Sequence, residues 1–290
     1  MSATRKWLRA RLDKGPLLVV PGAANALAAR VIEDTGFEAV YVSGAGIANT
    51  WLGVPDVGLV TLTELRGHVE AIREAVDVPL IVDADTGFGN PVGVAHTVRT
   101  LERAGADAIQ LEDQESPKRC GHFEGKRVVP AGEMVQKVRA ATDARRDDDL
   151  VIIARTDARV SEGLEAAVAR AARYLEAGAD VAFVEAPQSE EEVRSLPRLL
   201  DAPQVINLVE GGRTPVLPLA DLAGYRIALF ANLALQASVF GMQLVLSELK
   251  DAGTITGEAA KHVAVWQERQ RLVRKPEFDR LEDLYRAEGS

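Results

Sequence analysis

The residues from 112 to 126 bring together groups that could move protons and bind anions. They read EDQESPKRCGHFEGK and include the one cysteine of the chain, Cys120, with Arg119 before it and His122 two positions after it. Cationic neighbours favour the thiolate or poise a thiol for proton transfer, whereas a lone cysteine is more often a small buried apolar residue. Because this cysteine lies in a polar stretch with little to bury, we favour a reactive Cys120.

Four carboxylates lie at or near the expected ends of neighbouring strands. Asp83 and Asp85 are two residues apart, so on a pleated strand their side chains share a face, and Glu112 ends the next apolar run. Converging carboxylates repel one another unless a cation lies among them, and oxygen ligands suit Mg²⁺ or Mn²⁺ better than zinc. For Asp83 and Asp85 alone, a hydrogen-bonded aspartate and a helix cap would suffice. With Glu112 and Asp56 added, the sequence predicts a metal site.

Further polar residues end other apolar runs and could bind an anion. Arg155 can hold a carboxylate through two hydrogen bonds, although a salt bridge to Glu185 or Asp157 is the simpler alternative. Glu185 and Asn207 could complete the ring of groups or act only as structural polar residues. The run Ser43-Gly44-Ala45-Gly46 could turn backbone N–H groups toward an anion or form only a tight turn, and it lacks the spacing of a dinucleotide motif.

Eight short runs rich in β-branched residues supply the strands that would carry these groups. They alternate with stretches in which apolar residues recur every three or four positions, as on one face of a helix. Strands that alternate with helices pair in parallel through right-handed crossovers, and eight such units close into a barrel. The sequence therefore predicts a (β/α)8 barrel with strands near residues 17–20, 39–42, 80–82, 108–111, 150–154, 181–184, 205–208 and 227–230.

A repeat places the polar groups at one end of the predicted barrel. Glycine precedes three of the apolar runs, and each time a polar residue follows seven positions later, in the pairs Gly36 and Ser43, Gly105 and Glu112, and Gly178 and Glu185. A glycine there suits a left-handed C-cap of the preceding helix. The polar residue then lies at the C-terminal end of its strand, which is the end that faces the active site in this fold.

Length and composition agree with one large domain. At 290 residues, of which 47% are hydrophobic, the chain can bury a core of barrel size. A net charge of -9 without a run of basic residues argues against nucleic acid as a partner, and no apolar run approaches a membrane span. We expect a cytoplasmic protein with a barrel over residues 1–250 and a helical extension over 251–290 that packs on the barrel or on another subunit.

The motifs together resemble the isocitrate lyase and phosphoenolpyruvate mutase superfamily. They are the run Lys118-Arg119-Cys120-Gly121-His122, Asp83-Ala84-Asp85, Glu112-Asp113-Gln114, Ala154-Arg155-Thr156-Asp157 and the run EGGRTP at residues 210–215. The resemblance is greatest to 2-methylisocitrate lyases, 2,3-dimethylmalate or 2-alkylmalate lyases and carboxyphosphonoenolpyruvate mutases. It implies a (β/α)8 barrel whose eighth helix swaps between subunits of a homotetramer built from dimers.

The resemblance also implies the chemical groups of the site. Mg²⁺ would bind at Asp83, with Asp56, Asp85 and Glu112 reached partly through water. A gating loop would carry the signature that includes Lys118, Gly121 and His122, and its Cys120 would protonate the departing enolate.

The remaining matches imply how a small carboxylate substrate would be held. Tyr41 would assist at the substrate hydroxyl. The groups that would hold the keto-acid carboxylate are Ser43, Gly44, Ala45 and Arg155, and those that would hold the departing carboxylate are His122, Glu185 and Asn207. Asn232 departs from the pattern, because lyases and mutases usually carry proline there and oxaloacetate hydrolases serine.

The implied activity is that of a Mg²⁺-dependent carbon–carbon lyase. It would cleave a 2-hydroxy di- or tricarboxylate to a keto acid such as pyruvate and a carboxylic acid. A phosphonomutase and an oxaloacetate hydrolase or decarboxylase are the alternatives within the superfamily. Outside it, a glycoside hydrolase using Glu112 and Glu185 is disfavoured by an aromatic content of 5%, and a non-catalytic binding barrel stays open.

Overall fold

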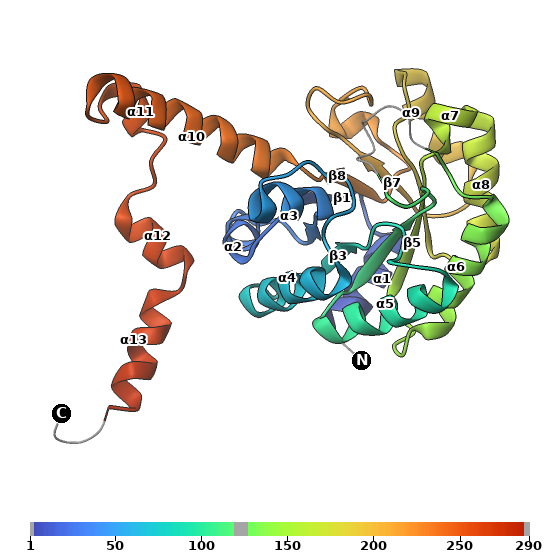
Figure 1. The fold of residues 1–290 in the computed structure, drawn as a ribbon, viewed down its shortest axis with the longest axis horizontal. Coiled ribbons are helices and arrows are strands. Elements are labelled where there is room, and N and C mark those ends of the chain that lie inside the picture. The colour runs from blue at the N-terminus through green and yellow to red at the C-terminus, as the bar shows by residue number, and fades with distance from the viewer. Residues whose placement is uncertain (1–2, 119–126, 287–290) are drawn as a thin grey trace. The chain divides into compact units, whose positions relative to one another are not determined.

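Eight parallel strands close into a barrel in the order in which they occur along the chain. The structure is a computed structural model that describes residues 3–118 and 127–286. Each strand pairs with the next, and β8 pairs with β1 to complete the ring (Figure 1). The strands are β1 (Leu18–Ala23), β2 (Val40–Val42), β3 (Leu80–Asp83), β4 (Ala108–Glu112), β5 (Val151–Thr156), β6 (Val181–Val184), β7 (Gln204–Asn207) and β8 (Ile227–Phe230). The predicted (β/α)8 barrel is confirmed.

Helices surround the strands on the outside of the barrel (Figure 1). They are α2 (Ala26–Asp34), α3 (Gly44–Ile47), the π-helix η1 (Ala48–Leu52), α4 (Leu62–Ala75), α5 (Pro91–Ala104), α6 (Ala131–Ala144), α7 (Ala158–Glu162), α8 (Leu164–Glu176) and α9 (Glu190–Leu199). Between β7 and β8 the chain forms only the short 3-10 helix η2 (Leu219–Asp221), so one of the eight units lacks an α-helix.

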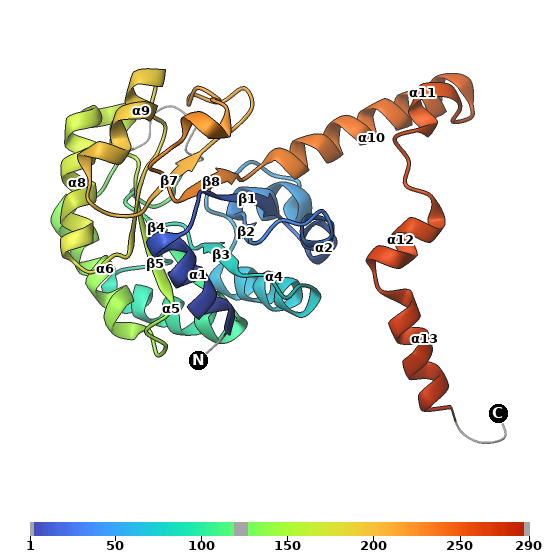
Figure 2. The same ribbon diagram turned by 180° about the vertical axis from the view of Figure 1, so that it is seen from behind.

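The N-terminal helix α1 (Ala3–Lys14) covers one end of the barrel. Its Leu8 and Leu12 are buried in the same apolar cluster as Val20, Ile81 and Phe183, which point into the barrel. Figure 2 shows α1, in dark blue, lying over the strands at this end. Because α1 fills this opening with apolar side chains, a site for polar ligands must lie at the opposite end, where the strands have their carboxyl termini.

Ion pairs join α1 to α5 and to loops at its end of the barrel. Arg5 Nη1 lies 3.4 Å from Glu102 Oε1 and 3.3 Å from Asp147 Oδ2, and Arg9 Nη1 lies 3.0 Å from Asp180 Oδ1. The Arg5 side chain is largely buried, so its pairs are shielded from solvent more than pairs on an open surface. These contacts serve stability at the end remote from the expected site.

The predicted glycine caps are confirmed. Gly36, Gly105 and Gly178 all have positive φ, between 95° and 109°, and each lies between a helix and the strand that follows it. Gly105 is the left-handed C-cap of α5. A Cβ on Gly105 would also lie 2.5 Å from Cγ of Arg73, whose guanidinium binds Asp107. Both the backbone conformation and the close side chain therefore require glycine here.

The chain separates into two compact units, residues 1–233 and residues 234–290. The second unit consists of most of α10 (Leu233–Ala252) with α11 (Gly257–Ala260), α12 (Trp266–Leu272) and α13 (Lys275–Leu284). This division follows the first residue of α10, whereas the sequence analysis placed the boundary between residues 250 and 251, near the end of α10; that boundary stays a prediction. None of the described helices is both long and apolar enough to cross a membrane.

We predict that Gly105→Ala destabilises the barrel by about 2 kcal/mol, because alanine at positive φ is strained and its Cβ displaces Arg73. Thermal or urea unfolding measures this change. Gly132→Ala is the matched control, since Gly132 lies exposed in α6 with no atom near the added Cβ, and alanine there should stabilise by up to about 1 kcal/mol. Equal effects of the two substitutions would contradict the prediction.

Candidate functional site

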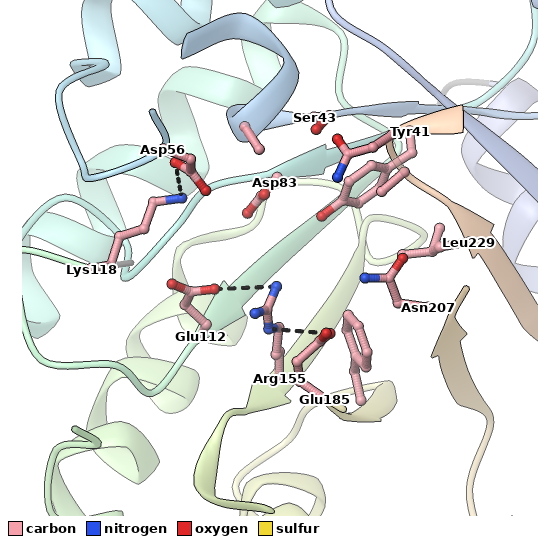
Figure 3. Close-up of a pocket in the computed structure, with 14 residues that line it drawn as sticks. Tyr41, Ser43, Asp56, Asp83, Glu112, Lys118, Arg155, Glu185, Asn207 and Leu229 are labelled. Atoms are coloured by element: carbon pink, nitrogen blue, oxygen red, sulfur yellow. Dashed lines mark ion pairs between the residues drawn. The ribbon is translucent and has the colours of Figure 1, made fainter. Parts of the chain in front are cut away.

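A polar pocket lies at the carboxyl ends of the strands (Figure 3). Most of the residues proposed from the sequence line it: Tyr41, Ser43, Ala45, Asp56, Asp83, Glu112, Lys118, Arg155, Glu185, Asn207 and Asn232. Their cavity is only about 30 Å³, which is room for roughly two water molecules. A dicarboxylate can therefore enter only if one or more of these side chains moves.

Lys118 inserts its ammonium group among the carboxylates. Its Nζ lies 2.6 Å from Asp56 Oδ1 and 2.6 Å from Asp85 Oδ1, and only 5% of its side chain is exposed (Figure 3 shows the pair with Asp56). Burial alone would lower the pKa of Lys118, but the charges of Asp85, Glu112, Asp83 and Asp56 together outweigh burial and raise the pKa above its usual value. The Lys118 ammonium group therefore stays protonated in this arrangement.

Asp85 adopts an unusual backbone conformation to take part in this cluster. Its φ is 49°, in the left-handed region that non-glycine residues seldom adopt, and strain of this kind gathers at functional sites. Burial, together with the nearby Asp83 and Asp56, raises the pKa of Asp85 to about 7 despite its pairing with Lys118. The N-cap of α5 is Asn90, so the simpler interpretation of Asp85 as a helix cap is wrong.

Gly44 lies against the same carboxylates. A Cβ built on Gly44 would be 3.2 Å from Asp85 Oδ1 and 3.4 Å from Asp83 Oδ2. The absence of a side chain thus lets the backbone after β2 approach the acidic groups closely. Ser43 caps α3 by accepting a hydrogen bond from the Gly46 N–H at 3.0 Å, so its hydroxyl oxygen already serves the turn.

Tyr41 points its hydroxyl into the pocket from β2 (Figure 3). The hydroxyl donates to Gln110 Oε1 at 3.2 Å, and Gln110 Nε2 donates in turn to Asp83 Oδ1 at 3.3 Å. Burial, followed by the negative charge of Asp83, raises the pKa of Tyr41 well above its usual value, so the phenol stays protonated. Sequence analysis missed Gln110, although it lies two positions before Glu112 and therefore on the same face of β4.

Arg155 forms the centre of the opposite wall. Its Nη1 is 3.4 Å from Glu112 Oε2 and its Nε is 3.7 Å from Glu185 Oε2 (Figure 3), while Asp157 binds it through two hydrogen bonds of 2.9 Å. Its guanidinium also lies over the ring of Phe183, 5.4 Å from the centroid. Arg155 therefore lines the pocket, as expected from the sequence. It also forms both ion pairs that the sequence offered as the simpler alternative, with Glu185 and with Asp157.

Several polar atoms in the pocket have no hydrogen-bond partner within the described part of the chain. They include Glu112 Oε1, Asn207 Oδ1 and Asn232 Oδ1. Buried polar atoms in folded proteins are nearly always satisfied, so unpaired oxygens that line a cavity indicate a place for water, a cation or a ligand. Burial raises the pKa of Glu112 well above its usual value, which Arg155 only partly offsets.

The side chains offer oxygen ligands of the kind that Mg²⁺ prefers. Within residues 3–118 and 127–286, no three acidic, histidine or cysteine side chains lie close enough together to form a complete metal site. Magnesium, however, usually keeps several waters and takes only one or two carboxylates directly. The Glu112 oxygen, which has no partner within the described ranges, and the buried Asp83, Asp85 and Asp56 suit such a hydrated ion. Cys120, Gly121 and His122 lie outside the described residues.

Known proteins with similar sequences belong to the superfamily that the motifs of the site resemble. The phosphoenolpyruvate phosphomutase family matches residues 8–249. The chain is 45% identical to 2,3-dimethylmalate lyase of Eubacterium barkeri over 256 residues, 88% of this chain and 89% of that protein. It is 48% identical to 2-methylisocitrate lyase of Aeropyrum pernix over 249 residues, 85% of this chain and 80% of that protein.

Solved structures agree with these relatives. An oxaloacetate acetylhydrolase in complex with 3,3-difluorooxalacetate has a TM-score of 0.91 at 32% identity, covering 97% of this chain and 96% of that one. A phosphonopyruvate hydrolase in complex with oxalate and Mg²⁺ has a TM-score of 0.88 at 31% identity, covering 97% and 99%. The chain belongs to the phosphoenolpyruvate phosphomutase family, within the isocitrate lyase and phosphoenolpyruvate mutase superfamily.

Proposed function

We propose that this protein is a Mg²⁺-dependent lyase that cleaves a carbon–carbon bond of a 2-hydroxy di- or tricarboxylate of the 2-methylisocitrate or 2-alkylmalate type. The observation that carries the proposal is the convergence, in one buried pocket, of Arg155 with acidic side chains, including a Glu112 oxygen without a partner among the described residues. The two relatives at 45% and 48% identity support it, because both are lyases of such acids.

A second candidate is hydrolysis of oxaloacetate. An oxaloacetate acetylhydrolase is among the similar structures, at 32% identity. Asn232 lines the pocket, and its Oδ1 has no hydrogen-bond partner among the described residues; this is the position where the superfamily pattern has proline in lyases and serine in those hydrolases. The chain thus has a polar group at this position, as the hydrolases do, but not the same group.

The residues of the pocket suit substrate binding and the stabilisation of charge in a lyase reaction. Arg155 binds the carboxylate beside the 2-hydroxyl, and its positive charge favours the keto acid that forms there. Tyr41, which stays protonated, donates a hydrogen bond to the substrate oxygen. Loss of the hydroxyl proton to a base lets the adjacent carbon–carbon bond break, and the bonding electrons pass to the leaving fragment as an enolate. Bound at Asp83, Mg²⁺ would supply Lewis-acid stabilisation of negative charge on oxygen.

The leaving fragment requires a proton at carbon. We propose that the Cys120 thiol gives this proton, which completes the carboxylic acid product and leaves a thiolate. Asn207 and Glu185 line the side of the pocket where the second carboxylate would lie, and the Asn207 amide can donate to it. The two products together contain all the carbon atoms of the substrate. The base has taken the hydroxyl proton, and the thiol has supplied the proton of the new carbon–hydrogen bond.

The direct test is turnover of a panel of acids with Mg²⁺, containing 2-methylisocitrate, 2,3-dimethylmalate and several 2-alkylmalates, followed by coupled detection of pyruvate and other keto acids. Oxaloacetate and phosphonopyruvate belong in the same panel. Cleavage of a 2-hydroxy acid that stops on removal of Mg²⁺ supports the lyase. Release of oxalate from oxaloacetate as the main activity would select the hydrolase, and turnover of phosphonopyruvate alone would select a phosphonomutase.

We predict that Cys120→Ser lowers the lyase rate by about 100-fold or more, because a serine hydroxyl is a far weaker acid than a thiol. Steady-state kinetics on the best substrate of the panel measures the change. The affinity for oxalate with Mg²⁺ should stay within about 2-fold, since the thiol acts in the chemical step. As the chain has one cysteine, alkylation of the wild type should reproduce the loss. A full rate in Cys120→Ser would rule out this acid.

We also predict that Lys118 opposes metal binding in the absence of substrate. Its ammonium pairs with Asp56 and Asp85, which lie among the proposed metal ligands, so Mg²⁺ must compete with it. Lys118→Met, similar in length but uncharged, should bind Mg²⁺ about 10-fold more tightly in calorimetry. Lys137→Met is the control, because that buried lysine donates to the Thr86 carbonyl and its ion pair is with Glu133, not with Asp56 or Asp85. Weaker Mg²⁺ binding in Lys118→Met would contradict the prediction.

We propose that α10 to α13 pack against another copy of the chain in a homotetramer of helix-swapped dimers. Within the chain these helices have almost no buried residues, Ala259 being the exception among those described. Large apolar side chains are exposed along them, including Phe240 at 66%, Trp266 at 63% and Leu284 at 70%. Apolar surface of this extent is usually covered by a partner.

We predict that Phe240→Glu lowers the oligomeric state, because a buried charge in an apolar interface is costly. Light scattering coupled to size exclusion reads the mass. Val92→Glu is the matched control, since Val92 is an exposed apolar residue on α5 of the barrel unit and its replacement should leave the mass unchanged. A monomeric wild type, or a Phe240→Glu variant with the same mass as the wild type, would contradict the proposal.

A further inference from the structure

Asp157 binds one edge of the Arg155 guanidinium through two hydrogen bonds. Arg155 Nε donates to Asp157 Oδ2 and Arg155 Nη2 to Asp157 Oδ1, both at 2.9 Å. Asp157 is 1% exposed and Arg155 7%, so this pair is shielded from water. A guanidinium is planar, and a carboxylate that binds it through two parallel hydrogen bonds fixes both its position and its rotation.

Asp157 is one of three acidic side chains around the Arg155 guanidinium. Glu112 lies 3.4 Å and Glu185 3.7 Å from its nitrogens, so two further carboxylates already face it. A third acid adds buried negative charge and its desolvation cost. What Asp157 adds is direction, because it engages the Nε and Nη2 edge and leaves Nη1 toward Glu112 and the pocket.

Asp157 is itself held by a buried network behind β5. Its backbone N–H donates to Asp113 Oδ1 at 2.9 Å. The other oxygen of Asp113 accepts from the Thr156 hydroxyl and from the Tyr174 hydroxyl, each at 2.7 Å, and lies 3.5 Å from Arg170 Nη1. These groups join the loops after β4 and β5 to α8, so the backbone at Asp157 has little freedom to move.

We propose that Asp157 is a positioning residue that fixes the Arg155 guanidinium so that its Nη1 edge receives the substrate carboxylate. The inference rests on the proposed function, in which Arg155 binds that carboxylate. Without the Asp157 charge, the guanidinium turns toward Glu112 and Glu185, which then occupy the nitrogens that a ligand needs. Carboxylate binding then weakens although Arg155 remains in the pocket.

The test is calorimetric binding of oxalate with saturating Mg²⁺. Asp157→Asn should weaken oxalate by about 10-fold or more, since a small misplacement of a binding group costs up to roughly 100-fold. The affinity for Mg²⁺ alone, measured in the same way, should stay within about 2-fold. Asp180→Asn is the matched control, because Asp180, like Asp157, accepts two hydrogen bonds from guanidinium groups. In Asp180 they come from Arg9 and Arg145, at the end of the barrel covered by α1. This control should lower the melting temperature without changing oxalate affinity.

A double-mutant cycle separates positioning from general stability. If Asp157 acts through Arg155, Asp157→Asn should change oxalate affinity less than about 2-fold when Arg155→Lys is already present. Should Asp157→Asn fail to fold, Asp157→Glu keeps the charge but displaces the carboxylate by one methylene, and it should still weaken oxalate by about 5-fold or more.

The outcomes distinguish this inference from the function on which it rests. If Arg155→Lys binds oxalate as tightly as the wild type, the carboxylate-binding role of Arg155 and with it the proposed function fail. If Arg155→Lys weakens oxalate but the variants at Asp157 bind it as tightly as the wild type, only the positioning role is overturned. An equal loss from Asp157→Asn in the Arg155→Lys background also overturns it, because the effect then does not pass through Arg155.

Discussion

The constraint that governs this structure is the burial of charge at the mouth of the barrel. Asp56, Asp83, Asp85 and Glu112 are all less than a tenth exposed, and they lie in or beside one pocket. An isolated buried carboxylate costs several kcal/mol, so the fold can hold such a group only with compensating cations and hydrogen bonds. Lys118 and Arg155 supply the cations within the described residues of the pocket.

The barrel meets this constraint by dividing its two ends between different tasks. At one end, α1 and its ion pairs close the opening with Leu8 and Leu12 packed into the apolar interior. That packing stabilises the fold without any group that a ligand needs. The opposite end can therefore hold a left-handed Asp85, like charges close together and oxygens that lack a partner in the part of the chain that the structure describes, because the free energy of folding comes from elsewhere.

The amino-acid sequence specifies the strand ends through local patterns, but it does not specify the partners of the polar groups in the same way. Glycine caps and the polar residues seven positions later are local features, so Glu112 and Glu185 could be assigned to the mouth of the barrel from the sequence alone. The choice of partner for Lys118 depends on how the chain turns after β4, which no local pattern specifies. The alternation of strands and helices also predicted an α-helix between β7 and β8, where the structure has only η2. The residues of this stretch mix turn-forming and apolar types, so they do not distinguish a helix from a loop.

The two cations of the pocket differ in a way that suits different tasks. Arg155 is a planar fork fixed by Asp157 on one edge and by the Phe183 ring below it, so it can present a constant geometry to an anion. Lys118 is a point charge at the end of a flexible chain, and its pairs with Asp56 and Asp85 can be exchanged for another cation without rebuilding the backbone. Since the cavity is too small for a dicarboxylate while Lys118 fills the acidic side, its departure would both open space and free the carboxylates. Under the proposed function, Arg155 would present this constant geometry to the substrate carboxylate, and Lys118 would leave the acidic side when Mg²⁺ binds there.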